Sequence, residues 1–128
     1  MKFAVVVHHD PGSAYGVTVP DLPGCFSAGD TFDEALDNTA EAIELHLEGL
    51  LEEGLDFPRA STIEQHLENP EFAGGTWGFV DFDIVPYLGN TEKINVTLPS
   101  SLIRKIDAKA GKRGRSNFLA EAALKDLA

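Results

Sequence analysis

The sequence predicts an α+β protein built from an N-terminal sheet with one long helix and a small C-terminal strand–helix–helix unit. Three observations predict it. Strand-like apolar runs flank one amphipathic helical pattern within residues 1–85, and residues 93–128 spell one alternating strand and two helices. A Pro- and Gly-containing stretch at residues 86–92 separates them. The charge also changes sign: residues 1–90 carry 17 acidic and two basic residues (−15), whereas residues 91–128 carry eight basic and four acidic residues (+4).

The N-terminal strands are predicted from apolar segments that end at turn residues. Residues 2–9 form a continuous apolar run, which is typical of a strand covered on both faces. Residues 15–19 alternate apolar and small residues and predict a second strand, and residues 25–28 predict a short third one. A fourth strand is expected at residues 78–85, where apolar side chains alternate with aspartates. The turns between them are rich in Asp, Pro and Gly.

The long helix is the clearest element. Thr31 fits an N-cap, and Glu34 three residues later completes a capping-box pattern. Apolar residues then recur at helical spacing up to Gly54, which supplies a stop. A second, acidic face follows the same period and includes Asp37, Glu41, Glu44 and Glu48. A loop is expected to start at Phe57-Pro58, followed by a short helix that ends near Leu67.

The C-terminal unit begins with an alternating strand. Ile94, Val96 and Leu98 share one face, and Lys93, Asn95 and Thr97 share the other. A first helix is expected after Pro99, and Ser116 is expected to cap a second helix after a Gly-rich turn at residues 111–114. A unit of this size rarely buries enough surface to fold alone, and a single strand leaves both edges unpaired. We therefore expect an intertwined homodimer in which two strands pair antiparallel.

A two-stranded ribbon of this kind fits the major groove of DNA. Its outward side chains, Lys93, Asn95 and Thr97, are the candidate base contacts. The candidate phosphate contacts follow the first helix: Lys112, Arg113, Arg115, and the first turn of the second helix at Ser116 and Asn117. For Lys93, Asn95 and Thr97 the alternative interpretation is an ordinary solvated strand face.

Two parts of the chain each resemble a known protein family. The run Ile94-x-Val96-x-Leu98-Pro99, followed by Gly114-Arg115-Ser116-x-Phe118-Leu119, resembles the ribbon-helix-helix repressors. The run from Tyr15 to Thr31, with its Pro-Asp-Leu-Pro-Gly-Cys turn, followed by the acidic helix, resembles HicB-type antitoxins.

The HicB resemblance implies a degenerate ribonuclease H-like domain that binds HicA. HicA is a small basic ribonuclease toxin with a double-stranded-RNA-binding fold and a catalytic histidine. The resemblance also implies repression of the antitoxin's own operon through the C-terminal tail, here of the ribbon-helix-helix kind. The expected partners are thus a HicA-type toxin, operator DNA and a second copy of the chain; a tetramer follows if the N-terminal domains also pair.

The toxin-facing residues are expected on the acidic face (Asp37, Glu41, Glu44 and Glu48) and at two strand aromatics, Tyr15 and Phe26. Two alternatives stay open at this point. The acidic residues could be an ordinary solvated helix face, and the aromatics could belong to the core.

A metal-dependent nuclease is the rival hypothesis, because Asp10, Asp81 and Asp83 could contribute to a carboxylate cluster. The first strand has no internal carboxylate, however, and His8 and His9 point to opposite faces, so we expect neither catalysis nor a cofactor or metal. Another alternative is an orphan DNA-binding regulator with a ligand-sensing or oligomerising N-terminal domain. The lone Cys25 excludes an intrachain disulfide and is expected to be buried. No segment approaches the length of a membrane span, and we expect a cytoplasmic protein.

Overall fold

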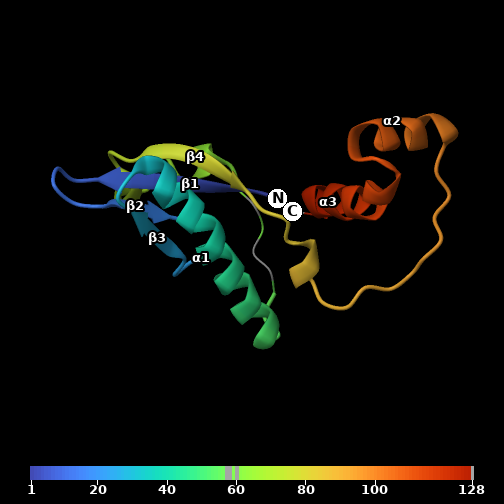
Figure 1. Cartoon of the computed structure of the whole chain (residues 1–128), viewed down its shortest axis with the longest axis horizontal. Helices are drawn as coiled ribbons and strands as arrows, with labels where there is room; N and C mark the ends of the chain where they lie inside the picture. The colour runs from blue at the N-terminus through green and yellow to red at the C-terminus, as the bar shows by residue number, and fades with distance from the viewer. Residues whose placement is uncertain (57–58, 60, 128) are drawn as a thin grey trace. The chain divides into compact units, whose positions relative to one another are not determined.

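The computed structural model of the chain describes residues 1–56, 59 and 61–127. These residues form two compact units, one at residues 1–87 and one at residues 88–128, and each is considered separately (Figure 1). The loop expected to start at Phe57-Pro58 lies outside the described residues. The α+β class predicted from the sequence is confirmed.

The first unit is a four-stranded antiparallel sheet with one helix against it (Figure 1). The strands are β1 (Lys2–His9), β2 (Tyr15–Thr18), β3 (Phe26–Gly29) and β4 (Thr76–Asp81). Their order is β3-β2-β1-β4, so β1 is central, and it pairs with β2 on one side and β4 on the other. Its continuous apolar sequence is explained by this position, because residues 3–7 are almost completely buried.

Helix α1 (Phe32–Glu52) begins at the predicted cap, Thr31, but of the predicted capping box only the bond to the Thr31 side chain is present at this cap. The Thr31 side chain accepts a hydrogen bond from the backbone N–H of Glu34 at 3.1 Å, which satisfies one free amide of the first turn. The helix approaches the sheet closely at Gly29, where an added Cβ would lie 2.5 Å from the backbone nitrogen of Ala35. The buried stripe of α1 (Ala35, Thr39, Ile43 and Leu47) completes the core together with the apolar residues of β1.

The segment between α1 and β4 contains two short 3₁₀ helices, Ile63–Gln65 and Pro70–Phe72, where the sequence predicts one short helix. Strand β4 starts two residues earlier and ends four residues earlier than predicted. It ends at Asp81, which pairs with Lys2 at the end of β1. Beyond it the side chain of Asp83 accepts a hydrogen bond from the backbone N–H of Val85, and a third 3₁₀ helix, Val85–Tyr87, follows. Pro86 and Tyr87, expected in a linker, therefore belong to the first unit.

The second unit contains α2 (Ser100–Ala110), the 3₁₀ helix Lys112–Gly114 and α3 (Arg115–Leu127). Both predicted helices are confirmed. Two details differ from the prediction. The 3₁₀ helix leads directly into α3, so Ser116 lies inside the first turn and is not the cap. Residues 93–98 do not form a strand in the single chain, because a strand needs a neighbouring strand for its backbone hydrogen bonds.

Candidate partner-binding surfaces

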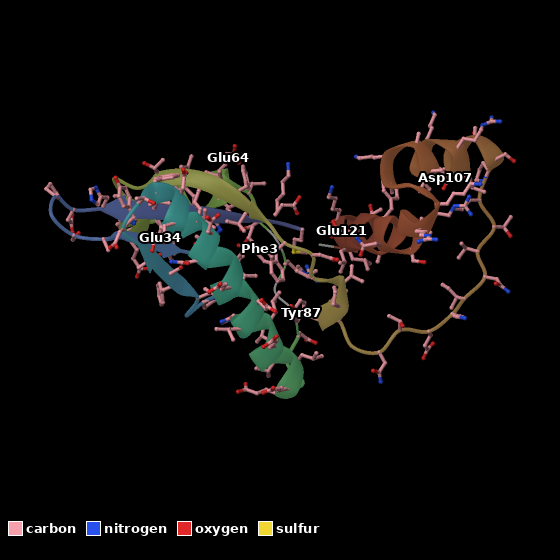
Figure 2. All side chains as sticks on the ribbon, viewed as in Figure 1. Phe3, Glu34, Glu64, Tyr87, Asp107 and Glu121 are labelled. Carbon is pink, nitrogen blue, oxygen red and sulfur yellow. The ribbon has the colours of Figure 1, made fainter. Side chains whose placement is uncertain are left out.

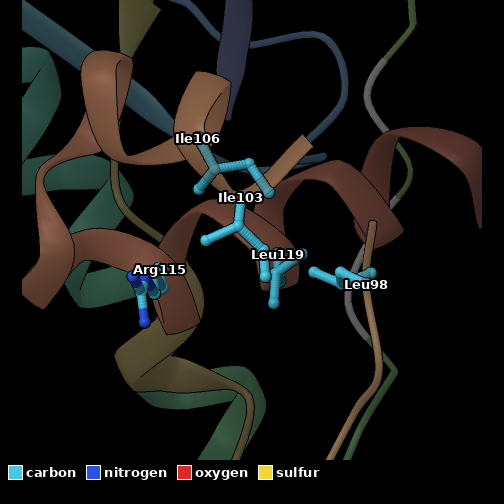
Figure 3. A pocket seen from close by; sticks show the side chains of 5 residues that line it. All are labelled: Leu98, Ile103, Ile106, Arg115 and Leu119. Atoms are coloured by element: carbon cyan, nitrogen blue, oxygen red, sulfur yellow. The ribbon is translucent and has the colours of Figure 1, made fainter. Parts of the chain in front are cut away.

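The segment that precedes α2 presents apolar side chains to solvent. Ile94 is 76% exposed and Val96 is 58% exposed. Nearby, an open apolar depression is lined by Leu98, Ile103, Ile106, Arg115 and Leu119 (Figure 3). Isolated exposed apolar side chains are common, but here two of them alternate along the chain beside an open apolar depression. The second unit thus has more apolar surface than a single copy covers.

The candidate base contacts lie on the same exposed segment. Lys93, Asn95 and Thr97 are all exposed, and so are the two apolar residues between them. A single chain therefore does not yet distinguish an inner face from an outer face. That distinction requires a second strand and a core for the apolar residues to enter.

The candidate phosphate contacts gather where α2 turns into α3. Lys112 and Arg113 are exposed on the 3₁₀ helix, and Ser116 and Asn117 are exposed in the first turn of α3. The turn depends on Gly111, whose φ of 75° falls in the region that favours glycine. Free backbone amides and nearby cations at the start of a helix can bind a phosphate.

Arg115 differs from these neighbours because its guanidinium is already engaged. Its Nε donates to Oδ1 of Asp107 and its Nη2 donates to Oδ2, both at 2.6 Å. This hydrogen-bonded pair lowers the pKa of the Asp107 carboxyl below its usual value and raises the pKa of the Arg115 guanidinium. Asp107 lies on α2 (labelled in Figure 2), so the pair joins the end of one helix to the start of the next.

The acidic face of α1 is solvent-exposed. Both interpretations from the sequence, a toxin-binding surface and an ordinary solvated helix face, require this exposure. Asp37, Glu41, Glu44 and Glu48 are all exposed and lie opposite the buried stripe. The helix sequence contains no Lys or Arg. Acidic residues three or four positions apart on a helix repel one another, so this face lowers helix stability when it is unpartnered. A basic partner surface would relieve that repulsion.

One part of the acidic face has a neighbour within the chain. Tyr87 (labelled in Figure 2) lies beside the carboxylates of Glu44 and Glu48. Partial burial and these carboxylates raise the pKa of the Tyr87 phenol above its usual value. The part of the acidic face formed by Glu44 and Glu48 therefore lies beside the segment that follows β4.

The two candidate aromatic contacts lie on opposite faces of the sheet. Tyr15 pairs with Gly29, whereas Phe26 pairs with Thr18, three residues along β2, so their side chains alternate in direction. Tyr15 is half-buried and stacks on His9, with ring centroids 3.8 Å apart. Phe26 is 65% exposed, so the core interpretation of this residue is wrong. A partner that covers one face of the sheet would contact one of these aromatics and not the other.

The structure also assembles a cluster that sequence analysis missed. The carboxylate of Asp21 accepts a hydrogen bond from the backbone N–H of Ser61 at 2.8 Å and another from the Ser61 hydroxyl. The Nε2 atom of His66 lies 2.6 Å from the Ser61 hydroxyl and 3.2 Å from Asp21. In a hydrolytic triad the carboxylate holds the other ring nitrogen, Nδ1. The cluster therefore fixes the loop to the turn after β2 and does not have the geometry of an activated nucleophile.

The metal-nuclease hypothesis receives no geometric support. Across residues 1–56, 59 and 61–127, no group of three or more His, Cys, Asp or Glu side chains is arranged to hold a metal ion. Asp81 ends β4 and lies beside the N-terminal amine, whereas Asp83 lies past the strand. Cys25 is buried, as predicted, and burial raises the pKa of its thiol. Among the helices described, none combines the length and the apolar character needed to cross a membrane.

Comparison with known proteins gives a consistent family. The family model for the HicB-like antitoxin of bacterial toxin–antitoxin systems matches residues 3–123. A 14.9 kDa protein from the rep–hol intergenic region of Haemophilus phage HP1 is 44% identical over 117 residues, which is 88% of each chain. The crystal structure of the Burkholderia pseudomallei antitoxin HicB is 47% identical, covers 100% of this chain and 99% of its own, and superposes with a TM-score of 0.74. A solved HicA3–HicB3 toxin–antitoxin complex contains a chain that is 30% identical, with 65% of this chain and 99% of that chain covered and a TM-score of 0.56.

Proposed function

The chain belongs to the HicB-like antitoxin family of bacterial toxin–antitoxin systems, and from this we propose that its first unit captures a HicA-type toxin and its second unit binds operator DNA to repress its own operon. The family is one of antitoxins, and the chain is not an enzyme. The observation that carries the proposal is that one chain has an acidic, exposed helix face in its first unit and a basic turn in its second unit.

Toxin capture needs binding and no chemistry. A face of carboxylates attracts a basic surface and accelerates encounter, and covering that surface would deny nucleic acid access to it. The similarity to a HicB3 chain solved together with HicA3 supports a HicA-type partner. We place the contact on the acidic face of α1, with Tyr15 or Phe26 as the aromatic contribution, since these two lie on different faces of the sheet. The further assignment of this unit to a degenerate ribonuclease H-like fold is part of the same proposal.

The experiment is co-expression with a HicA-type toxin, followed by pull-down and a growth assay. Within a complex obtained this way, Glu41→Gln with Glu48→Gln should slow association and reduce its dependence on salt. The matched control is Glu64→Gln with Glu68→Gln, which removes the same charge from exposed positions outside α1. An equal effect of both pairs would contradict a contact through α1, and failure of growth rescue would contradict toxin capture itself.

DNA binding requires two chains in this proposal. The segments at residues 93–98 pair across a two-fold axis, which buries Ile94 and Val96 and leaves Asn95 on the outer face of the ribbon. The exposed apolar surface of the second unit supports such an intertwined dimer. Asn95→Ala should reduce discrimination between operator and scrambled duplexes in a gel-shift titration while toxin inhibition survives. Unchanged discrimination would exclude Asn95 from base recognition.

A further inference from the structure

The ion pair between Asp107 and Arg115 has a geometry that bears on how the second unit would engage DNA. Two parallel hydrogen bonds of 2.6 Å use the Nε and Nη2 groups of the guanidinium and both carboxylate oxygens. Such a bidentate pair is short, charge-assisted and directional. At neutral pH it also cancels the charge of Arg115 locally, because Asp107 supplies one negative charge to match it.

We propose that Arg115 is a positioning residue and not a phosphate contact: Asp107 holds it, and through it the start of α3, so that Lys112, Arg113 and the first-turn amides of α3 face the DNA backbone. This inference rests on the proposed DNA-binding function. It replaces the expectation that Arg115, like its two basic neighbours, binds phosphate directly.

The position of the pair in the fold supports this role. Asp107 lies in the last turn of α2, and Arg115 is the first residue of α3. The connection between them is tightly constrained, since Gly111 has a positive φ and a Cβ at Gly114 would lie 3.1 Å from the Cβ of Ala110. The ion pair links the two ends of this connection, Asp107 on α2 and Arg115 on α3. It thereby fixes the direction in which the free amides of α3 point.

Because Asp107 is negatively charged, the direction in which its substitution changes the DNA affinity tests the inference. Removing a carboxylate from a basic surface should strengthen DNA binding if only net charge matters. If the pair positions α3, Asp107→Asn should weaken binding instead, although the protein becomes more positive. The two models therefore predict opposite directions for one substitution.

The test uses the full chain and a duplex that contains the promoter of its own operon, titrated by fluorescence anisotropy at several KCl concentrations. Each substitution removes its side chain from both chains of the dimer, so the loss of one phosphate-binding residue should reduce the slope of log affinity against log salt by about 1.8, which is about 0.9 for each chain. We expect that reduction for Lys112→Gln and for Arg113→Gln. For Arg115→Gln we expect an unchanged slope with affinity lowered by about tenfold.

Asp107→Asn should lower affinity to the same extent as Arg115→Gln, and the double variant should be no worse than either single variant. Asp107→Glu, which keeps the carboxylate, should recover part of the affinity. Circular dichroism establishes that each variant is folded at the temperature of the titration, which excludes unfolding as the cause of a lower affinity.

A slope reduction of about 1.8 for Arg115→Gln, or stronger binding by Asp107→Asn, would overturn the inference while leaving DNA binding intact. Failure of the wild-type chain to bind the duplex would overturn the proposed DNA-binding function, and the role of Arg115 with it.

Discussion

Replacing Ile94 by alanine tests whether a second copy of the chain covers the segment before α2. Ile94 is 76% exposed in the single chain, and its neighbour in the alternating pattern, Val96, is 58% exposed. In the proposed dimer both side chains enter a core shared by two chains, so each substitution removes apolar contacts twice. The expected result is a weaker dimer, with a larger effect at Ile94 than at Val96.

The size of the effect follows from the exposed fractions. Alanine removes three side-chain carbons from Ile94, and at about 0.8 kcal/mol for each buried carbon the exposed 76% gives about 1.8 kcal/mol per chain and about 3.6 kcal/mol per dimer. Alanine removes two carbons from Val96, which with 58% exposure gives about 1.9 kcal/mol per dimer by the same reasoning. The dimer dissociation constant should therefore rise by about 500-fold for Ile94→Ala and about 20-fold for Val96→Ala.

Sedimentation velocity over a range of protein concentrations measures these constants. Leu67→Ala is the matched control, because it also removes three carbons from a side chain that is 56% exposed, but in the first unit. The control should leave the dissociation constant unchanged. A shift of less than about tenfold for Ile94→Ala, or an equal shift for Leu67→Ala, would refute the reasoning from exposed apolar surface.

Further predictions concern stability and reactivity. Gly29→Ala should severely destabilise the first unit in thermal unfolding, because its Cβ would lie 2.5 Å from the backbone nitrogen of Ala35; an unchanged midpoint would contradict that close approach. Thr31→Ala should cost about 1 kcal/mol in chemical denaturation through loss of the helix cap, and Thr31→Ser should restore most of it. Cys25 should react with a thiol reagent near pH 8 much more slowly in the folded than in the unfolded protein, since burial raises its pKa; equal rates would show that the thiol is accessible. The lowered pKa of Asp107 means that its ion pair stabilises the fold above the ordinary carboxyl pKa of 3.8 and that this stabilisation is lost progressively as the pH falls below that value. An Asp107→Asn variant should therefore have less helix than wild type at pH 6, and the difference should shrink as the pH is lowered below 3.8.

Much of the local structure could be predicted from the sequence because its causes are local. The Thr31 cap, the buried run of β1 and the two C-terminal helices depend on neighbouring residues and on one period of side chains. The family resemblance was also contained in short runs, such as the turn before Cys25, and the comparisons confirm it. The acidic face of α1 could be placed opposite its apolar stripe for the same reason.

Features that join distant residues were decided only by the tertiary structure. Asp21 precedes Ser61 by 40 residues and His66 by 45, and the three meet because the loop folds back onto the turn after β2. Phe26 reaches solvent because it points to the face of the sheet opposite to Tyr15, which contacts Phe32 at the start of α1, and no local pattern reveals which face is covered.

The sequence by itself determined an α+β chain with an acidic antitoxin-like part and a basic strand–helix–helix part. Periodicity, capping and charge depend only on each residue and its near neighbours in the sequence. Only the tertiary structure decided which charges remain available to a partner. Tyr87 lies against Glu44, and Asp107 holds Arg115, because a side chain's partners depend on which elements pack together and not on its place in the sequence. An exposed charge in a sequence pattern is therefore a candidate contact, and its neighbours in space determine whether it is free to act as one.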